Sequence, residues 1–197
     1  MVGFLKVTFG PMFSNKTSGL CEEINNYIIF NQIHKNCHPK VLIINSKKDT
    51  RDELKKNNNL TTHNKYKTYE FPSNVESKKV LNLKEINDEE IKKYDYLAID
   101  ESQFFDDLKF FVDKCLFFNK YIHCSGLIAD TEKKPFGQLY LIIPYADEVI
   151  QLKAFCKDCN SQYKNAVFTK WVGKKEKINQ TEIGATGKYI PVCGEHY

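Results

Sequence analysis

The order of apolar and polar positions along the 197-residue chain predicts buried strands that alternate with helices. Residues 4–9 alternate and are rich in β-formers, a Gly-Pro pair then breaks the run, and residues 16–33 carry apolar side chains at helical spacing. Short apolar runs predict further strands at residues 41–44, 94–99 and 121–127, with a helical stretch at 105–118. Parallel strands joined by crossover helices follow, so we expect an α/β fold.

Two regions depart from this pattern. Between residues 52 and 88 the chain is rich in Asn, Lys and Glu and contains one predicted strand at 66–71, so we expect a mobile surface region there. From residue 156 onward, two cysteine-containing motifs enclose a β-rich run and a polar segment. We therefore divide the chain into a main domain at residues 1–151 and a small metal-pinned lobe at 152–197.

Composition changes this picture only in detail. The chain is 42% hydrophobic, and 29 basic against 25 acidic residues give a formal net charge of +4, too small to indicate nucleic-acid binding. No apolar run approaches the roughly 20 residues of a membrane span, and the first ten residues do not resemble a signal peptide. We expect a cytoplasmic protein without membrane contact, whose seven cysteines are reduced, some of them bound to metal.

A candidate phosphate-binding loop joins the first strand to the first helix. Residues 10–17 read Gly-Pro-Met-Phe-Ser-Asn-Lys-Thr, with Asn15 where the motif has glycine. Such a loop turns backbone N–H groups toward a polyphosphate, while its lysine bridges phosphate oxygens and its hydroxyl binds magnesium. Lys16 and Thr17 can fill these roles, and Asn is the residue other than glycine that best tolerates a positive φ. The alternative is an ordinary strand-to-helix turn that contains Lys-Thr.

Two adjacent carboxylates follow the apolar strand at residues 96–99. Asp100 and Glu101 stand at its carboxyl end, which is where open parallel sheets bind their ligands. Because successive side chains at a strand end diverge, Asp100 can help to hold magnesium while Glu101 faces a substrate hydroxyl as general base. Alone, such a pair is more often a solvated turn or helix cap. The phosphate loop favours the functional interpretation.

Four potential metal ligands lie near the end of the chain. Cys156 and Cys159 form one pair and Cys193 and His196 the other, each with two intervening residues. Three thiolates and one imidazole suit tetrahedral zinc, and a site with four protein ligands is structural rather than catalytic. The alternatives are unliganded buried cysteines, or a zinc ribbon that binds nucleic acid through nearby lysines.

Taken in order, these segments resemble the thymidine kinase family whose members carry a structural zinc, and the resemblance covers nearly the whole chain. The matching blocks are GPMFSNKTSGL, the lysine-rich run at residues 47–51, Thr62-His63, the intact Asp-Glu-Ser-Gln-Phe-Phe motif at residues 100–105, and residues 134–137. The resemblance implies a P-loop NTPase-like parallel sheet flanked by helices, with a C-terminal zinc lobe whose loop covers the nucleoside.

The same resemblance implies ATP-dependent phosphorylation of the 5′-hydroxyl of thymidine, which gives dTMP and ADP, with structural Zn²⁺ and with Mg²⁺ bound to ATP. Glu101 is then the base, and Lys16 and Arg51 stabilise the phosphate charge. The implied ATP-binding residues are Gly10, Pro11, Met12, Phe13, Ser14, Asn15, Lys16, Thr17, Ser18 and Asp49. The implied nucleoside-binding residues are Met12, Phe104, Leu127, Thr131, Phe136, Thr169, Ile183, Gly184 and Tyr189. A homotetramer and feedback inhibition by dTTP are further expectations.

Three positions near the implied nucleoside pocket depart from the family pattern. Ile128 replaces an acidic or amide residue, Thr131 stands where a phenylalanine packs beside the base, and Trp171 replaces a basic residue. Loss of an aromatic wall removes stacking worth on the order of 1 kcal/mol. The sequence therefore leaves two alternatives open: a kinase with altered nucleoside preference, and a catalytically weak nucleotide-binding homologue.

Overall fold

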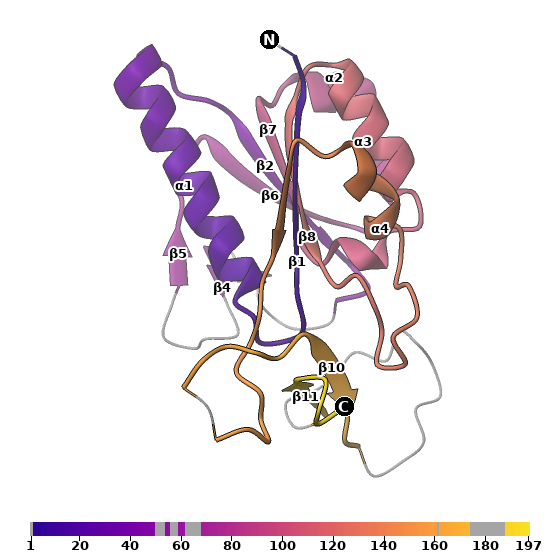
Figure 1. Ribbon diagram of the computed structural model, residues 1–197. Coiled ribbons are helices and arrows are strands. Elements are labelled where there is room, and N and C mark those ends of the chain that lie inside the picture. The colour runs from indigo at the N-terminus through magenta and orange to yellow at the C-terminus, as the bar shows by residue number, and fades with distance from the viewer. Residues whose placement is uncertain (1, 50–53, 56–58, 62–67, 161, 174–187) are drawn as a thin grey trace.

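A six-stranded parallel sheet forms the centre of the molecule. The computed structural model describes residues 2–49, 54–55, 59–61, 68–160, 162–173 and 188–197. Its strand order is β6-β2-β7-β8-β1-β9 (Figure 1). The strands are β1 (Phe4–Phe9), β2 (Val41–Ser46), β6 (Val75–Val80), β7 (Tyr96–Ile99), β8 (Tyr121–Gly126) and β9 (Glu148–Gln151). All five pairings between them are parallel, which confirms the predicted α/β fold.

Helices cover both faces of the sheet. The long helix α1 (Lys16–Lys35) lies on one face and the shorter helices on the other (Figure 1). These are α2 (Asp88–Lys92), α3 (Leu108–Phe117) and α4 (Leu139–Ile142), with short 3₁₀ segments at η1 (Leu83–Glu85), η2 (Ser102–Phe104) and η3 (Ile143–Tyr145). Neighbouring residues of β2 alternate between the two apolar cores, because Ile43 packs with α1 and Ile44 with the opposite layer.

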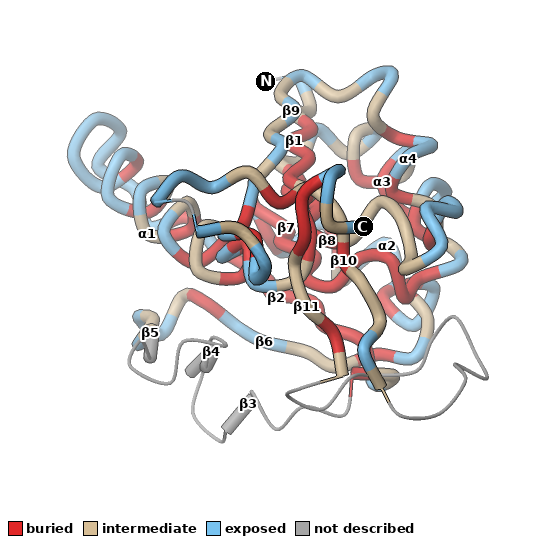
Figure 2. The backbone as a smooth tube through the Cα atoms, turned by 60° about the horizontal axis from the view of Figure 1, so that its bottom comes forward, coloured by how far each residue is buried: buried red, intermediate tan, exposed pale blue. Residues whose placement is uncertain are grey.

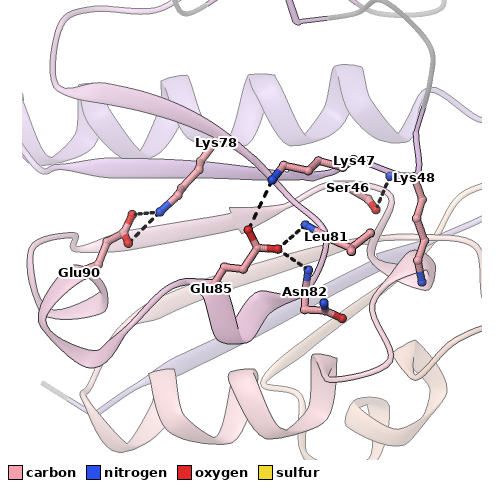
Figure 3. A network of polar contacts seen from close by, with 8 residues as sticks. All are labelled: Ser46, Lys47, Lys48, Lys78, Leu81, Asn82, Glu85 and Glu90. Atoms are coloured by element: carbon pink, nitrogen blue, oxygen red, sulfur yellow. Dashed lines mark hydrogen bonds and ion pairs between the residues drawn. The ribbon is translucent and has the colours of Figure 1, made fainter.

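Residues 75–88 correct the second half of our expectation of a mobile surface region at 52–88. Its first part is β6, an edge strand of the main sheet with Val75 and Val80 buried at its ends. Between them, Lys78 contacts Glu90 of α2 at 2.7 Å. After the strand, the Glu85 carboxylate of η1 accepts hydrogen bonds from the backbone N–H groups of Leu81 and Asn82 (Figure 3). A high charge content therefore signalled a half-covered edge strand rather than a flexible loop.

Two smaller sheets complete the structure. An antiparallel sheet comprises β3 (Leu54–Lys55), β4 (Asn59–Thr61) and β5 (Thr68–Glu70), the last within the strand predicted at 66–71. The C-terminal lobe is built on β10 (Phe168–Trp171) and β11 (Tyr189–Val192), which pair antiparallel. Figures 1 and 2 both show this lobe across the carboxyl ends of the central strands. The boundary that we set between residues 151 and 152 stays a prediction.

Within the described segments, no helix combines the length and the apolar character that a bilayer crossing requires.

A buried polar network lies between the sheet and α1. The Lys6 ammonium is 3.1 Å from a carboxylate oxygen of Glu23 and 3.1 Å from one of Glu148. Beside it, His123 is joined to the Thr8 hydroxyl at 2.8 Å and to the Tyr96 hydroxyl at 3.1 Å. Burial, and then the charge of Lys6, lower the pKa of His123 from its ordinary value of 6.5 to about 3. The imidazole is therefore neutral at the pH of a cell.

This network predicts a specific loss of stability in acid. Because the pKa of His123 is lower in the folded chain, the unfolded chain binds an extra proton as the pH falls from 6.5 toward 3. His123 therefore contributes a loss of about 2 to 3 kcal/mol in the free energy of unfolding between pH 6.5 and 4.5. We expect His123→Gln to have a smaller pH dependence over this range in urea unfolding. The exposed His38→Gln is the control, and equal slopes in the two variants would contradict the assignment.

Candidate active site

The loop between β1 and α1 contains two residues in the left-handed conformation. Asn15, the N-cap of α1, has φ 65° and ψ 30°, and Phe13 has φ 65°. The position where the motif has glycine thus requires a positive φ, and Asn accepts this conformation at lower cost than most side chains. Gly10 is required for another reason, since a Cβ there would lie 2.6 Å from the Leu152 carbonyl oxygen. The loop has the shape that its sequence predicts.

Lys16 folds back over the loop that precedes it. It is buried, and its ammonium donates hydrogen bonds to the carbonyl oxygens of Gly10 at 3.0 Å and Pro11 at 2.8 Å. Ser14 is also buried, and its hydroxyl has no hydrogen-bond partner among the described residues. Ser18 lies in the first turn of α1. A cation, a hydroxyl and the positive end of a 20-residue helix therefore meet at this loop, which suits a polyphosphate.

The first turn of α1 meets the carboxyl end of β7 through one hydrogen bond. The Thr17 hydroxyl donates to a carboxylate oxygen of Asp100 at 2.9 Å, and both side chains are buried. Hard oxygen donors of this kind are the ligands that Mg²⁺ prefers, so the donor set fits this ion. The two residues predicted to hold magnesium are therefore adjacent, although 83 positions separate them in the chain.

Glu101 is buried and has φ 48°, an uncommon conformation for this residue type. Gln103 holds its side chain: the Gln103 amide donates to a Glu101 carboxylate oxygen at 2.6 Å and accepts from the Leu127 N–H at 2.9 Å. Gly126 makes room for this contact, since a Cβ there would lie 2.5 Å from the Gln103 oxygen. We did not predict a role for Gln103, although its place two residues after Glu101 was a usable signal.

The segment that follows β2 also reaches this end of the sheet. Asp49 is buried, and its N–H donates to the Ser46 carbonyl oxygen at 3.0 Å. Lys48, another residue for which we predicted no role, donates from its ammonium to the Phe104 carbonyl oxygen at 3.1 Å and so ties β2 to η2. Arg51 lies outside the described residues. Asp49 thus lies just beyond the carboxyl end of β2.

The first residues predicted to contact the nucleoside lie on η2, on β10 and in the loops beside them. The Phe104 and Phe136 rings meet edge to face, with centroids 5.9 Å apart. The Thr169 hydroxyl, on β10, accepts a hydrogen bond from the Met12 N–H at 3.0 Å and so joins the lobe to the phosphate loop.

The other residues predicted to contact the nucleoside lie on β11 and in the segment after β8. Tyr189 is buried beside Trp171, with ring centroids 4.9 Å apart. Leu127 follows β8 and contacts Gln103, as noted above. Thr131 lies on the loop that leads to Phe136. Ile183 and Gly184 lie outside the described residues.

The four predicted metal ligands converge in the lobe. Ligand atoms of Cys156, Cys159, Cys193 and His196 all lie within 4.8 Å of one another. The His196 Nδ1 is 3.2 Å from the Cys193 sulfur and 3.4 Å from the Cys159 sulfur. A tetrahedral zinc site with these donors has ligand separations of about 3.5 to 3.8 Å. The cluster therefore fits a structural zinc.

The environment of one ligand thiol favours the form that zinc binds. Burial opposes ionisation of Cys156, but hydrogen bonds from neighbouring backbone N–H groups, that of Cys193 foremost, lower the pKa of its thiol to about 6. A thiol with this pKa is mostly thiolate at neutral pH, and the thiolate is the form that coordinates zinc.

Comparisons with known proteins agree with this geometry. A family model described as thymidine kinase matches residues 3–197. The chain belongs to the thymidine kinase family. A thymidine kinase of Amsacta moorei entomopoxvirus is 34% identical over 96% of this chain and 94% of its own length. Thymidine kinase 1 of Dictyostelium discoideum is 33% identical over 98% of this chain and 77% of its own length. The human cytosolic thymidine kinase is 28% identical over 97% of this chain and 71% of its own length.

Family membership confirms the resemblance and the enzyme class predicted from the sequence. The match to the family model also covers the C-terminal lobe, because residues 3–197 include both pairs of zinc-ligand candidates. A zinc ribbon that binds nucleic acid is therefore not favoured.

Removal of one proposed zinc ligand, Cys159, tests whether this chain binds zinc. We expect the purified chain to contain about one zinc ion, and Cys159→Ser to lose most of it, because three donors bind zinc far more weakly than four. The thermal midpoint should fall by roughly 5 to 10 °C, since the metal contributes directly to folding. Metal analysis and calorimetry measure both quantities. The exposed Cys37→Ser is the control, and equal zinc contents in the two variants would rule the cluster out.

Proposed function

We propose that the chain transfers the γ-phosphoryl group of ATP to the 5′-hydroxyl of thymidine, which yields dTMP and ADP. The observation that carries this proposal is the meeting, at one edge of the sheet, of the phosphate loop, the Thr17–Asp100 pair and Glu101. The match to thymidine kinases over residues 3–197 supports the choice of substrate. No residue of this chain forms a covalent intermediate in the proposed reaction, so catalysis depends on positioning and charge.

ATP is proposed to bind with its phosphates against residues 10–18. Backbone N–H groups at the start of α1 face the phosphate oxygens, and the Lys16 ammonium exchanges its two carbonyl partners for them. Asp49 and Arg51 complete the ATP-facing group, with Arg51 offsetting charge on the transferred phosphoryl group. This part of the proposal predicts that the loop conformation changes little when ATP binds.

Thr17 and Asp100 would hold the Mg²⁺ that accompanies ATP. The ion supplies a positive charge that offsets the negative charge of the β- and γ-phosphates. The protein contributes a hydroxyl and a carboxylate that are already in contact and buried, so neither has to be ordered when the substrate arrives.

Glu101 is proposed to accept the proton of the 5′-hydroxyl as the oxygen attacks phosphorus. Its carboxylate needs a fixed direction for this, and Gln103 supplies it by holding one of its two oxygens. The carboxylate held in this way is proposed to face the hydroxyl. Gln103 in turn is held by the Leu127 N–H, so the base is fixed to two strands of the sheet.

The nucleoside is proposed to lie between the edge of the sheet and the zinc lobe. Phe104, Phe136, Leu127, Met12 and Thr131 would line one side of its pocket. Residues of the lobe would cover the other side, namely Thr169, Ile183, Gly184 and Tyr189. A cover of this kind excludes water from the phosphoryl group, which limits wasteful hydrolysis of ATP. A structural zinc would keep the cover in register with the phosphate loop, through the Thr169–Met12 hydrogen bond.

Four parts of the proposal go beyond the substrates. We include the homotetramer, feedback inhibition by dTTP, a cytoplasmic location and the division into a kinase domain and a zinc lobe. The name of the human relative gives a cytosolic location for that protein, which supports a cytoplasmic location for this chain. The separate apolar cluster around Ala154, Ala166 and Val192 supports the fourth.

The experiment that tests this function is phosphoryl transfer from Mg²⁺-ATP to a panel of nucleosides, with protein of verified zinc content. We expect turnover on thymidine in preference to deoxycytidine and deoxyguanosine, with deoxyuridine intermediate because it lacks only a methyl group. Turnover confined to another nucleoside would mean that Thr131 or Ile128 has changed the preference. An absence of turnover on the whole panel would contradict the proposal and favour a nucleotide-binding homologue without catalysis.

The role of Glu101 predicts a selective loss of turnover. Glu101→Gln keeps the size of the side chain and a hydrogen bond to Gln103 but removes the base, so kcat should fall by about 10²- to 10⁴-fold. Thymidine affinity should stay within about threefold of the unchanged chain, because the proton is transferred only during reaction. Steady-state kinetics and calorimetric titration measure the two. Glu89→Gln, at an exposed ion pair on α2, is the control, and an unchanged kcat in Glu101→Gln would refute the role.

A further inference from the structure

A short hairpin connects the proposed nucleoside pocket to the zinc lobe. We call residues 128–136 the finger. Its two arms are joined by a β-bridge between Ala129 and Pro135, and by a hydrogen bond from the Phe136 N–H to the Ile128 carbonyl oxygen at 3.1 Å. The Asp130 carboxylate accepts the N–H groups of Glu132 at 2.8 Å and of Lys134 at 3.0 Å. This closed turn makes the finger a stiff unit.

The base of the finger, which is its end nearest the sheet at Phe136, packs against η2. Phe136 and Phe104 are both buried, and their rings are nearly perpendicular, at 88°. The next residue, Gly137, has φ 64°, and a Cβ there would lie 2.2 Å from the Gln103 carbonyl oxygen. The base is therefore fitted closely to η2, which carries Gln103 and Phe104.

The tip of the finger is held by a residue next to the zinc cluster. Tyr197 follows the zinc-ligand candidate His196 directly, and its hydroxyl donates to the Thr131 carbonyl oxygen at 2.5 Å. The Lys133 ammonium lies 3.7 Å from the centroid of the Tyr197 ring and 4.6 Å from that of Phe168. The two rings lie 5.2 Å apart. A hydrogen bond and a shared cation–π contact thus join the tip to Phe168, at the start of β10, and to Tyr197, beside the zinc-ligand candidate His196.

We propose that Tyr197 is a positioning residue for the nucleoside: it fixes the finger to the zinc-bound turn and so sets the position of Phe136 in the pocket. This inference rests on the proposed function, because it takes the finger to line the thymidine pocket. A stiff hairpin transmits a displacement of its tip to its base, and here the base is an aromatic wall against Phe104. The phosphate loop is joined to the lobe by a separate contact, Thr169 to Met12, so the effect should not extend to ATP.

The test is the thymidine dissociation constant of Tyr197→Phe, which removes only the hydroxyl. Loss of this hydrogen bond should raise the constant about 2- to 10-fold. A second variant, Lys133→Asn, removes the cation but suits the left-handed backbone at φ 61°, and should raise the same constant by a smaller factor. The KM for ATP, the zinc content and the thermal midpoint should stay unchanged in both. Calorimetric titration, steady-state kinetics and metal analysis give these values.

Tyr145→Phe is a matched control for the first variant. The Tyr145 hydroxyl also donates to an oxygen acceptor, a carboxylate of Asp113 at 2.8 Å, and a lysine also lies over its ring, at 5.6 Å. It belongs to η3, in the helix layer, and should leave thymidine affinity unchanged.

Three outcomes would overturn the inference. An unchanged thymidine constant in Tyr197→Phe and Lys133→Asn, beside an active wild-type chain, would overturn it and leave the proposed function in place. A parallel rise in the thymidine and ATP constants would overturn it in favour of general loosening. A wild-type chain with no turnover on any deoxynucleoside would overturn the proposed function and this inference together.

Discussion

In the central sheet, the parallel register of β1, β7 and β8 brings the carboxyl ends of three strands to one edge. Phe9 lies opposite Gly126 and Ile99 opposite Cys124, so the residues that follow these strands emerge side by side. The phosphate loop, the Asp100–Glu101 pair and Leu127 all follow from this alignment. A shift of one residue in any of these pairings would turn the side chains to the other face and separate the Thr17–Asp100 contact. The sheet therefore sets the geometry of the chemistry before any loop does.

Four of the six described non-glycine residues with positive φ lie at the edge where the substrates are proposed to meet or in the finger. Phe13, Asn15 and Glu101 have positive φ, and Lys133 at the tip of the finger does too. Such a conformation costs of order 1 to 3 kcal/mol for most side chains and less for Asn15, and it persists only where the surroundings determine it. Here the surroundings are two apolar cores, one on each face of the sheet, and the inner strands β1, β2, β7 and β8 are almost wholly buried between them. The large core thus stabilises a small region that would not hold its shape alone.

Much of this architecture could be predicted from local patterns. Residues 4–9 were predicted as a strand and form β1 with those bounds, because alternation with a Gly-Pro break is unambiguous. β6 escaped prediction because only the ends of an edge strand are buried, so its charged middle hid the pattern. The ligand cluster at Cys156 and His196 could be predicted because spacing alone restricts its geometry.

The remaining features depend on contacts between distant segments. Gln103 contacts Leu127, and Lys48 contacts Phe104, so the role of each side chain depends on a residue far away in the sequence. Tyr197 was missed for the same reason, since its partners are 66 residues away at Thr131. Periodicity and motif spacing describe one segment at a time, whereas these roles exist only once the sheet has brought two segments together.

The contact between Tyr197 and the finger uses the main-chain oxygen of residue 131, not its side chain. A carbonyl oxygen is present whichever amino acid occupies that position, so the docking of the hairpin does not depend on which side chain stands there. Substitution there can change the chemistry of one wall of the pocket while the wall stays where it is. The mechanical support of the proposed pocket is thereby independent of the side chain at position 131.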